Sequence, residues 1–140
     1  EPMAWDYGDL RALAAWIDSD GSIPFARGRQ KRMRSGFAYH VSIRVYNNDR
    51  RPLDWMVKTF GGRIHPHHGQ TCLGQRYCFY WDAGPMLDAV LAAVIPYLMV
   101  RRERALAAQE LRTATQERKA AIWAQNVRPT RATRRAALSS

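Results

Sequence analysis

The chain has 140 residues, of which 46% are hydrophobic and five are tryptophans, and this composition predicts one folded domain rather than a disordered basic tail. Its formal net charge of +10 favours nucleic acid as the partner. The sequence contains no apolar run near the roughly 20 residues that span a bilayer, and no secretory signal precedes the fold. We therefore expect an intracellular protein without a membrane partner.

The first predicted element is a helix over residues 9–18, with Asp9 as a candidate N-cap. Its apolar face has helical spacing and consists of Leu10, Leu13, Ala14 and Ile17. The helix leads directly into an acidic segment, Asp18, Ser19, Asp20 and Gly21. Carboxylate oxygens are ligands that hard divalent cations prefer. An acidic helix end in a basic chain indicates metal-assisted chemistry on a polyanion.

Two half-buried strands are predicted next, at residues 22–26 and 40–46, because apolar and polar side chains alternate there. They flank a basic turn that is bracketed by Gly28 and Gly36. A two-stranded ribbon fits the major groove, and arginine is the commonest side chain that reads guanine. We interpret this segment as a DNA-reading hairpin; the alternative is a solvated loop with surplus charge. The candidate contacts are Ser22, Arg27, Arg29, Lys31, Arg32, Arg34, His40, Ser42, Arg44, Tyr46, Arg50 and Arg51.

A turn at residues 47–49 starts a short amphipathic helix that ends at Gly61. A second hairpin follows, with strands at residues 63–67 and 75–81. Pro66 cannot donate a ladder hydrogen bond, so this strand should lie at an edge. Alternation places Ile64, Tyr77, Phe79 and Trp81 toward the core. The candidate DNA contacts of this hairpin are Arg63, His65, His67, Gln70, Gln75, Arg76 and Tyr80, with Cys78 on the same face.

The third helical region starts near Pro85, and Pro96 should break it. One long helix is expected after Arg101, through Leu111 and on toward Trp123. The composition then shifts to arginine without acid, which is typical of a basic tail that contacts phosphates. We divide the chain into an N-terminal arm (1–8), a central domain (9–125) and a basic tail (126–140).

The second hairpin also contains five residues of the types that bind structural zinc: His65, His67, His68, Cys72 and Cys78. Zinc ligands usually occur in tight pairs such as C-x2-C, and this stretch has no such pair of cysteines. Strand alternation would also place some of these side chains on opposite faces. The spacing therefore favours reduced, partly buried thiols over a zinc cluster.

Residues 13–21 read LAAWIDSDG, which resembles the signature motif of the LAGLIDADG homing endonucleases. Ala15 replaces the usual glycine, and Trp16 occupies a position that is usually smaller. The glycine pair before the third strand and the Pro-Tyr-Leu at residues 96–98 also match the family. The order of predicted elements is α+β. The resemblance implies a four-stranded antiparallel saddle-shaped sheet with helices packed on one face, and roughly spans residues 9–111.

The resemblance also implies a chemistry: hydrolysis of phosphodiester bonds in both strands of a long, roughly palindromic double-stranded DNA, with no small-molecule substrate. Asp20 would be the direct Mg²⁺ ligand, assisted by a backbone carbonyl near Ser19, and Ca²⁺ or Mn²⁺ could substitute. Asn47 matches a polar position where glutamine is common, and Arg101 a position where lysine is usual. Arginine does not deprotonate at working pH, so Arg101 would stabilise charge rather than act as a base. Asp18 would cap or orient the turn at the helix end.

One motif copy supplies one metal-binding carboxylate, whereas a duplex has two strands to cut. Family members with a single motif act as homodimers through the motif helix, here Leu13, Ala14, Ala15, Trp16 and Ile17. The alternatives are a catalytically silent LAGLIDADG-type DNA-binding protein or an RNA-splicing maturase. An unrelated small basic protein would leave the acidic helix end unexplained.

Overall fold

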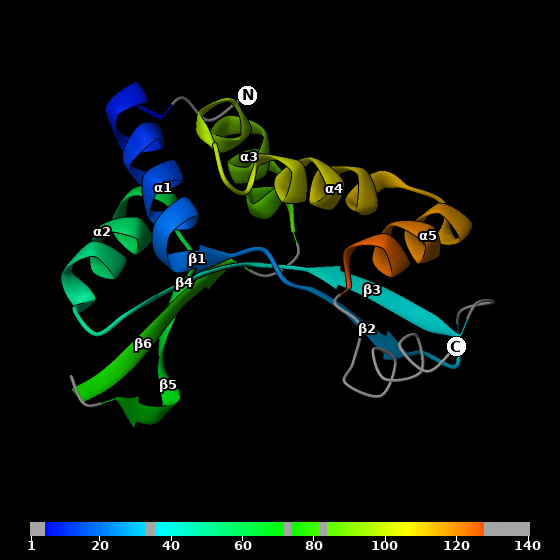
Figure 1. The fold of residues 1–140 in the computed structure, drawn as a ribbon, viewed down its shortest axis with the longest axis horizontal. Helices are drawn as coiled ribbons and strands as arrows, with labels where there is room; N and C mark the ends of the chain where they lie inside the picture. Colours follow the sequence, from blue (N-terminus) through cyan, green and yellow to red (C-terminus); the bar gives the residue numbers. More distant parts are fainter. Residues whose placement is uncertain (1–4, 33–35, 72–73, 82–83, 128–140) are drawn as a thin grey trace, which may run out of the picture.

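The computed structural model describes residues 5–32, 36–71, 74–81 and 84–127, and Figure 1 shows their fold. Within these ranges the helices are α1 (Tyr7–Asp20), α2 (Arg50–Phe60), α3 (Pro85–Val94), η1 (Ile95–Tyr97, a 3-10 turn), α4 (Arg102–Thr113) and α5 (Gln116–Asn126). The strands are β1 (Gly21–Ser22), β2 (Phe25–Arg29), β3 (Phe37–Val41), β4 (Ile43–Asn47), β5 (Arg63–Thr71) and β6 (Gly74–Trp81).

The strands form a four-stranded antiparallel sheet in the order β1-β4-β6-β5 and a two-stranded antiparallel ribbon, β2-β3. The described helices lie on one side of the strands, and the opposite face is curved and carries none of them (Figure 1). This arrangement confirms the α+β fold, with an antiparallel sheet and helices on one face, that the sequence predicts.

The two strands of the first predicted hairpin are each interrupted once, at Pro24 and Ser42. The pairing register does not change across the gap, because Ser22 pairs with Arg44 on one side and Phe25 pairs with Val41 on the other. Proline has no N–H to donate, so the ladder cannot be complete at Pro24. One hydrogen bond, from the Ser42 amide to the Pro24 carbonyl at 3.3 Å, crosses this gap. The hairpin is thus one long ribbon whose distal half, β2-β3, extends beyond the main sheet.

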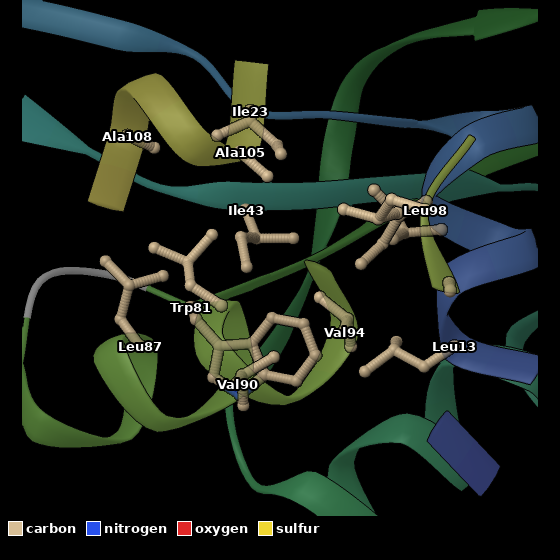
Figure 2. Close-up of a cluster of buried hydrophobic side chains, with 14 of the residues drawn as sticks. Leu13, Ile23, Ile43, Trp81, Leu87, Val90, Val94, Leu98, Ala105 and Ala108 are labelled. Atoms are coloured by element: carbon tan, nitrogen blue, oxygen red, sulfur yellow. The ribbon is translucent and has the colours of Figure 1, made fainter. Parts of the chain in front are cut away.

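The hydrophobic core fills the layer between the sheet and the helices. Figure 2 shows side chains from α1, α3 and α4 meeting those of the strands, among them Leu13, Ile43, Trp81, Val90 and Ala105. Phe79 and Trp81 are buried as predicted, and Ile64 and Tyr77 pack against the core from partly exposed positions. The indole of Trp81 donates a hydrogen bond to the Phe60 carbonyl at 3.4 Å, which satisfies its polar group.

Two predicted helices differ in their bounds, and the first, expected over residues 9–18, extends from Tyr7 to Asp20. The N-cap of α1 is Asp6, not Asp9, and its carboxylate accepts hydrogen bonds from the amides of Gly8 (2.9 Å) and Asp9 (3.4 Å). The single long helix expected after Arg101 is two helices, because the Thr115 hydroxyl accepts from the Arg118 amide at 3.3 Å and caps α5. A threonine hydroxyl that accepts from the backbone competes with continuation of the helix. The spacing of apolar residues along the sequence does not reveal such a hydrogen bond.

Pro66 and Pro96 lie where the sequence predicts them to lie, at an edge strand and at the end of a helix. The peptide that contains Pro96 forms a 3-10 turn directly after α3, and Pro66 lies on β5, an edge strand of the sheet. The β5-β6 register shifts between Pro66 and Gln70. In the part of the chain that is described, no helix has the length and apolarity to cross a membrane.

Candidate active site and nucleic-acid interface

The end of α1 joins the sheet without a linker. Gly21 is both the C-cap of α1 and the first residue of β1, where it pairs with Val45. A Cβ at this position would lie 2.7 Å from the Ile17 Cα and 3.0 Å from the Arg44 carbonyl oxygen, so only glycine allows this approach. The junction places the motif carboxylates beside β4, whose last residue is Asn47.

The two aspartates of the motif have different roles. The Asp18 carboxylate accepts hydrogen bonds from the amides of Met99, at 2.8 Å, and Arg101, at 3.0 Å. Asp20 is exposed, and its carboxylate has no hydrogen bond or ion pair with any described residue. An exposed carboxylate without an internal partner is available to a cation. Of the two aspartates, Asp20 is thus the one whose carboxylate remains available to a cation, and Asp18 is the one engaged with the chain's own backbone. The metal role of Asp20 and the orienting role of Asp18 stay predictions.

Arg101, at the start of α4, contacts the C-terminal end of α1. It occupies the N-cap position of α4, and its Nε donates to the Ile17 carbonyl of α1 at 3.0 Å. With Ser22 and Arg104 it lines a hollow of about 450 Å³. The structure thus brings the positive charge of Arg101 to the end of α1; its predicted catalytic role stays a prediction.

Asn47 lies at the end of β4, but its side chain is partly occupied. Its Oδ1 accepts a hydrogen bond from the Asp49 amide at 2.9 Å, in the turn that starts α2. Its amide nitrogen is therefore the group that remains for a water molecule or a phosphate oxygen.

The residues at the helix end fit part of a divalent metal site. Oxygen from a carboxylate and from a backbone carbonyl suits Mg²⁺ or Ca²⁺, and Asp20 together with the carbonyl near Ser19 offers such a pair. The Ser19 hydroxyl itself donates to the Trp16 carbonyl at 3.4 Å. Among the described residues, no group of three or more His, Cys, Asp or Glu side chains could hold a metal ion. The remaining ligands would have to come from DNA, water or a second chain.

The described zinc candidates do not form a site. The His65 ring packs at a tilt against Tyr80 with centroids 4.9 Å apart, and His67 packs edge-on against Tyr46 at 5.0 Å. Cys78 is buried, and this burial raises the pKa of its thiol. The side chains of His68 and Cys72 lie outside the described residues.

The curved face of the ribbon contains a hollow of about 530 Å³. Its lining includes five of the predicted DNA contacts: Ser22, His40, Ser42, Arg44 and Tyr46. These positions alternate along β1 to β4, so the polar set of the period-two pattern faces the side opposite the helices, as predicted.

Arginine side chains of this face make cation–π contacts with aromatic rings on the neighbouring strand. The Arg44 guanidinium lies 5.6 Å from the Tyr80 ring centroid, and its Nε donates to the Ser42 hydroxyl at 3.2 Å. The Arg76 guanidinium lies 5.0 Å from the Tyr46 ring. Contacts of this kind restrict the rotamers of long side chains, so less entropy is lost when they meet a ligand. The result is a positively charged surface whose side chains are already ordered.

Several predicted DNA contacts are engaged elsewhere. Arg27 lies on the helix-facing side of β2, with its guanidinium 3.9 Å from the Trp123 ring centroid and 4.3 Å from that of Phe37. The Gln75 amide donates to the carbonyls of His67, at 3.0 Å, and Arg76, at 2.8 Å. Side chains alternate between the two faces of β2, so Arg27 lies on the face opposite Ala26, which lines the hollow. Gln75 is instead engaged by the two backbone carbonyls of its own hairpin.

Arg50 and Arg51 lie at the start of α2, where each is paired with a carboxylate. Arg50 is 3.3 Å from Asp54, and Arg51 is 2.6 Å from Asp49. The Arg51 side-chain hydrogen bond lowers the pKa of Asp49 to about 2. Two nearby carboxylates thus reduce the charge that these arginines were expected to offer DNA, which a count of basic residues does not reveal.

The other candidates are exposed or undescribed. Arg29, Lys31 and Arg32 are exposed at the far end of the β2-β3 ribbon, and Arg63 is exposed at the start of β5. Arg34 and the Gln70 side chain lie outside the described residues.

Sequence reasoning missed Arg104, which holds three segments together. Its guanidinium lies 3.8 Å from the Phe25 ring, its Nε donates to the Ile23 carbonyl at 2.8 Å, and its Nη1 donates to the Asn126 carbonyl. No sequence signal identifies these partners, because they lie far from Arg104 along the chain.

The predicted dimer interface needs revision. Leu13, Ala14 and Ile17 are buried in the core of their own chain, so they are not available to a partner. Ala15 is exposed and Trp16 is partly exposed. The outward surface of α1 is therefore centred on Ala15.

Solved structures share this fold. The homing endonuclease I-CvuI in complex with the I-CreI target is 21% identical over 74% of this chain and 64% of that chain, with a TM-score of 0.64. The archaeal intron-encoded homing endonuclease I-Vdi141I complexed with DNA is 17% identical over 75% of this chain and 67% of that one (TM-score 0.66). The group I intron-encoded homing endonuclease I-CeuI complexed with DNA is 15% identical over 90% and 62% (TM-score 0.65).

No protein-family model matches the chain, and no curated protein matches it in sequence. In this fold, the acidic end of α1 lies beside the basic curved face of the strands. This chain has the fold of the LAGLIDADG homing endonucleases, which is the fold that the sequence resemblance implies. It spans slightly less than two thirds of I-CvuI in the complex with the I-CreI target and of I-CeuI.

Proposed function

We propose that this protein is a site-specific, metal-dependent endonuclease that cuts both strands of a long, roughly palindromic double-stranded DNA. The observation that carries the proposal is the exposed carboxylate of Asp20, unpaired among the described residues, beside a basic face that no described helix covers. The I-CvuI structures were determined with Mg or Ca, and the I-Vdi141I and I-CeuI structures with DNA. The fold, the site and these complexes support the same chemistry.

The active form would be a homodimer, because each chain offers one Asp20 and a duplex has two scissile bonds. Helix α1 would form the contact through its outward surface, where the small side chain of Ala15 permits close approach of two helices. A twofold axis there would bring the two Asp20 carboxylates together and place two curved faces along one duplex. Trp16, which is partly exposed, would border this contact.

Residues of this chain would divide the chemistry as follows. Asp20 and the carbonyl near Ser19 would hold Mg²⁺, which when bound supplies charge neutralisation and lowers the pKa of a bound water. The Asn47 amide nitrogen would orient a water molecule or a phosphate oxygen. The Arg101 guanidinium would stabilise negative charge that develops on the phosphate, without taking a proton.

DNA would lie along the curved face, with Arg44 and His40 in its hollow reaching base edges. Arg29, Lys31 and Arg32 would contact phosphates farther from the centre. Phosphate contacts provide affinity and register, whereas base contacts provide sequence preference.

The test replaces Asp20 by asparagine, which keeps the size of the side chain and removes its charge. On a duplex that the parent cuts with Mg²⁺, we expect Asp20→Asn to bind and not to cut, and EDTA to stop the parent. Asp9→Asn, which removes a carboxylate from the first turn of the same helix, is the matched control and should cut normally.

Cleavage by Asp20→Asn at the parental rate would disprove the metal assignment. Specific binding by the parent with no cleavage in any divalent metal would instead identify a silent DNA-binding protein. Splicing of a host intron would reveal a maturase.

A further inference from the structure

We propose that Asp18 is a positioning residue for cleavage, because it holds the turn that carries Arg101. This inference rests on the proposed nuclease function and assigns Asp18 a role that acts through Arg101, not through the metal. It concerns residues 98–101, which connect η1 to α4.

The turn has little apolar packing of its own. Leu98 is fully buried and anchors one end, but Met99 is 85% exposed and Val100 is 74% exposed. Burial of side chains therefore cannot fix the backbone between Leu98 and Arg101. Polar contacts must do so, since an exposed loop without them would be mobile.

Those contacts come from α1. One oxygen of the Asp18 carboxylate accepts from the Met99 amide at 2.8 Å, and the other accepts from the Arg101 amide at 3.0 Å. Hydrogen bonds to an ionised acceptor are stronger than neutral ones. Both oxygens are used, and the two bonds hold alternate residues of the same turn.

The same carboxylate also satisfies the amide of the N-cap residue at the start of α4. The N-cap residue of α4 is Arg101, whose own side chain makes no capping hydrogen bond. The carboxylate from α1 lies at this end of α4, where the helix dipole favours negative charge. Helix α1 thus stabilises the start of α4 from outside.

Arg101 completes the connection in the opposite direction, because its Nε donates to the Ile17 carbonyl at 3.0 Å. The backbone amide and the guanidinium of Arg101 therefore both bind the last turn of α1, at Asp18 and Ile17. Asp20 lies in the same turn. Any shift of the turn would move the guanidinium relative to the candidate metal ligand. A displacement of about 1 Å can reduce a reaction rate about 100-fold.

The experiment compares Asp18→Asn, which keeps one acceptor oxygen, with Asp18→Ala, which keeps none. We expect single-turnover cleavage of a bound duplex to slow about 10-fold for Asn and about 100-fold for Ala, with the dissociation constant for DNA unchanged. The matched control is Asp6→Ala, because Asp6 accepts two backbone amides at the other end of the same helix, far from Arg101 along the chain. Urea unfolding measures the stability lost by each variant.

A double-mutant cycle with Arg101→Gln tests the route. If Asp18 acts through Arg101, Asp18→Asn should slow the Arg101→Gln protein far less than it slows the parent. Equal slowing in both backgrounds, or equal slowing by Asp6→Ala at equal loss of stability, would overturn the inference while leaving the nuclease proposal intact. Absence of cleavage by the parent would overturn the proposed function, and the inference with it.

Discussion

The guanidinium of Arg27 on β2 lies 3.9 Å from the ring centroid of Trp123 on α5. Phe37, on the paired strand β3, faces the same guanidinium at 4.3 Å, so Arg27 lies between two aromatic rings. The Gln116 amide of α5 adds a hydrogen bond to the Phe37 carbonyl at 3.0 Å. Helix α5 therefore supports the β2-β3 ribbon where it extends beyond the main sheet, and one basic residue of the hairpin serves the fold.

Replacing Arg27 by alanine should destabilise the protein by about 1 kcal/mol, because two cation–π contacts are lost. Urea unfolding followed by tryptophan fluorescence measures the change. Arg29→Ala, two residues away on the same strand, is the control and should alter stability by less than about 0.5 kcal/mol. Equal destabilisation by both variants would contradict the role assigned to Trp123.

Arg44 should determine base preference. Because Tyr80 and the Ser42 hydroxyl hold its guanidinium on the curved face, Arg44→Ala should relax discrimination at one symmetric pair of target positions by about 1–3 kcal/mol. Binding to a library of single-substituted duplexes provides the measurement. Arg32→Ala, at the exposed end of the ribbon, should weaken all duplexes alike and reduce the salt dependence. A uniform loss for Arg44→Ala would make Arg44 a phosphate contact.

The outward surface of α1 should control dimer formation. Ala15→Glu would place two like charges face to face across the proposed twofold axis, and we expect the dimer dissociation constant to rise about 100-fold or more. Analytical sedimentation at several concentrations, with and without DNA, measures it. Ala124→Glu, at an exposed alanine of α5, should leave the constant unchanged. A parent that sediments as a monomer on its cognate DNA would refute the dimer.

The Asp49–Arg51 pair should make stability depend on pH in the acid range. The Arg51 side chain lowers the pKa of Asp49 from 3.8 to about 2, so the folded state favours the ionised carboxylate. This contribution is fully present above pH 3.8 and is lost as the pH falls toward 2. Urea unfolding should show a constant difference between the parent and Asp49→Asn near neutral pH, which shrinks across this window. A difference at pH 2 as large as that near neutral pH would show that the charge is not responsible.

Most of the architecture could be predicted from local patterns. Period-two alternation located the strands, glycine and proline marked the turns, and the string at residues 13–21 indicated the acidic helix end. These signals involve residues that are neighbours along the chain, so they can be read without knowledge of tertiary contacts. The hollow around Arg44 was predictable for the same reason, because alternation assigns a face to every residue of a regular ribbon.

The errors occurred where a distant residue supplies the partner. Nothing near Arg27 in the sequence reveals that Trp123 will cover it. For Asp18 the sequence indicated a capping or orienting role, but not that Met99 and Arg101 would be the donors. Leu13 and Ile17 were assigned to a dimer contact, yet their own chain buries them. The charge and hydropathy of a side chain determine which kinds of contact it can make. Which partner it contacts was decided only by the tertiary structure, through the packing of α1 against α3 and the strands and of α5 against the ribbon.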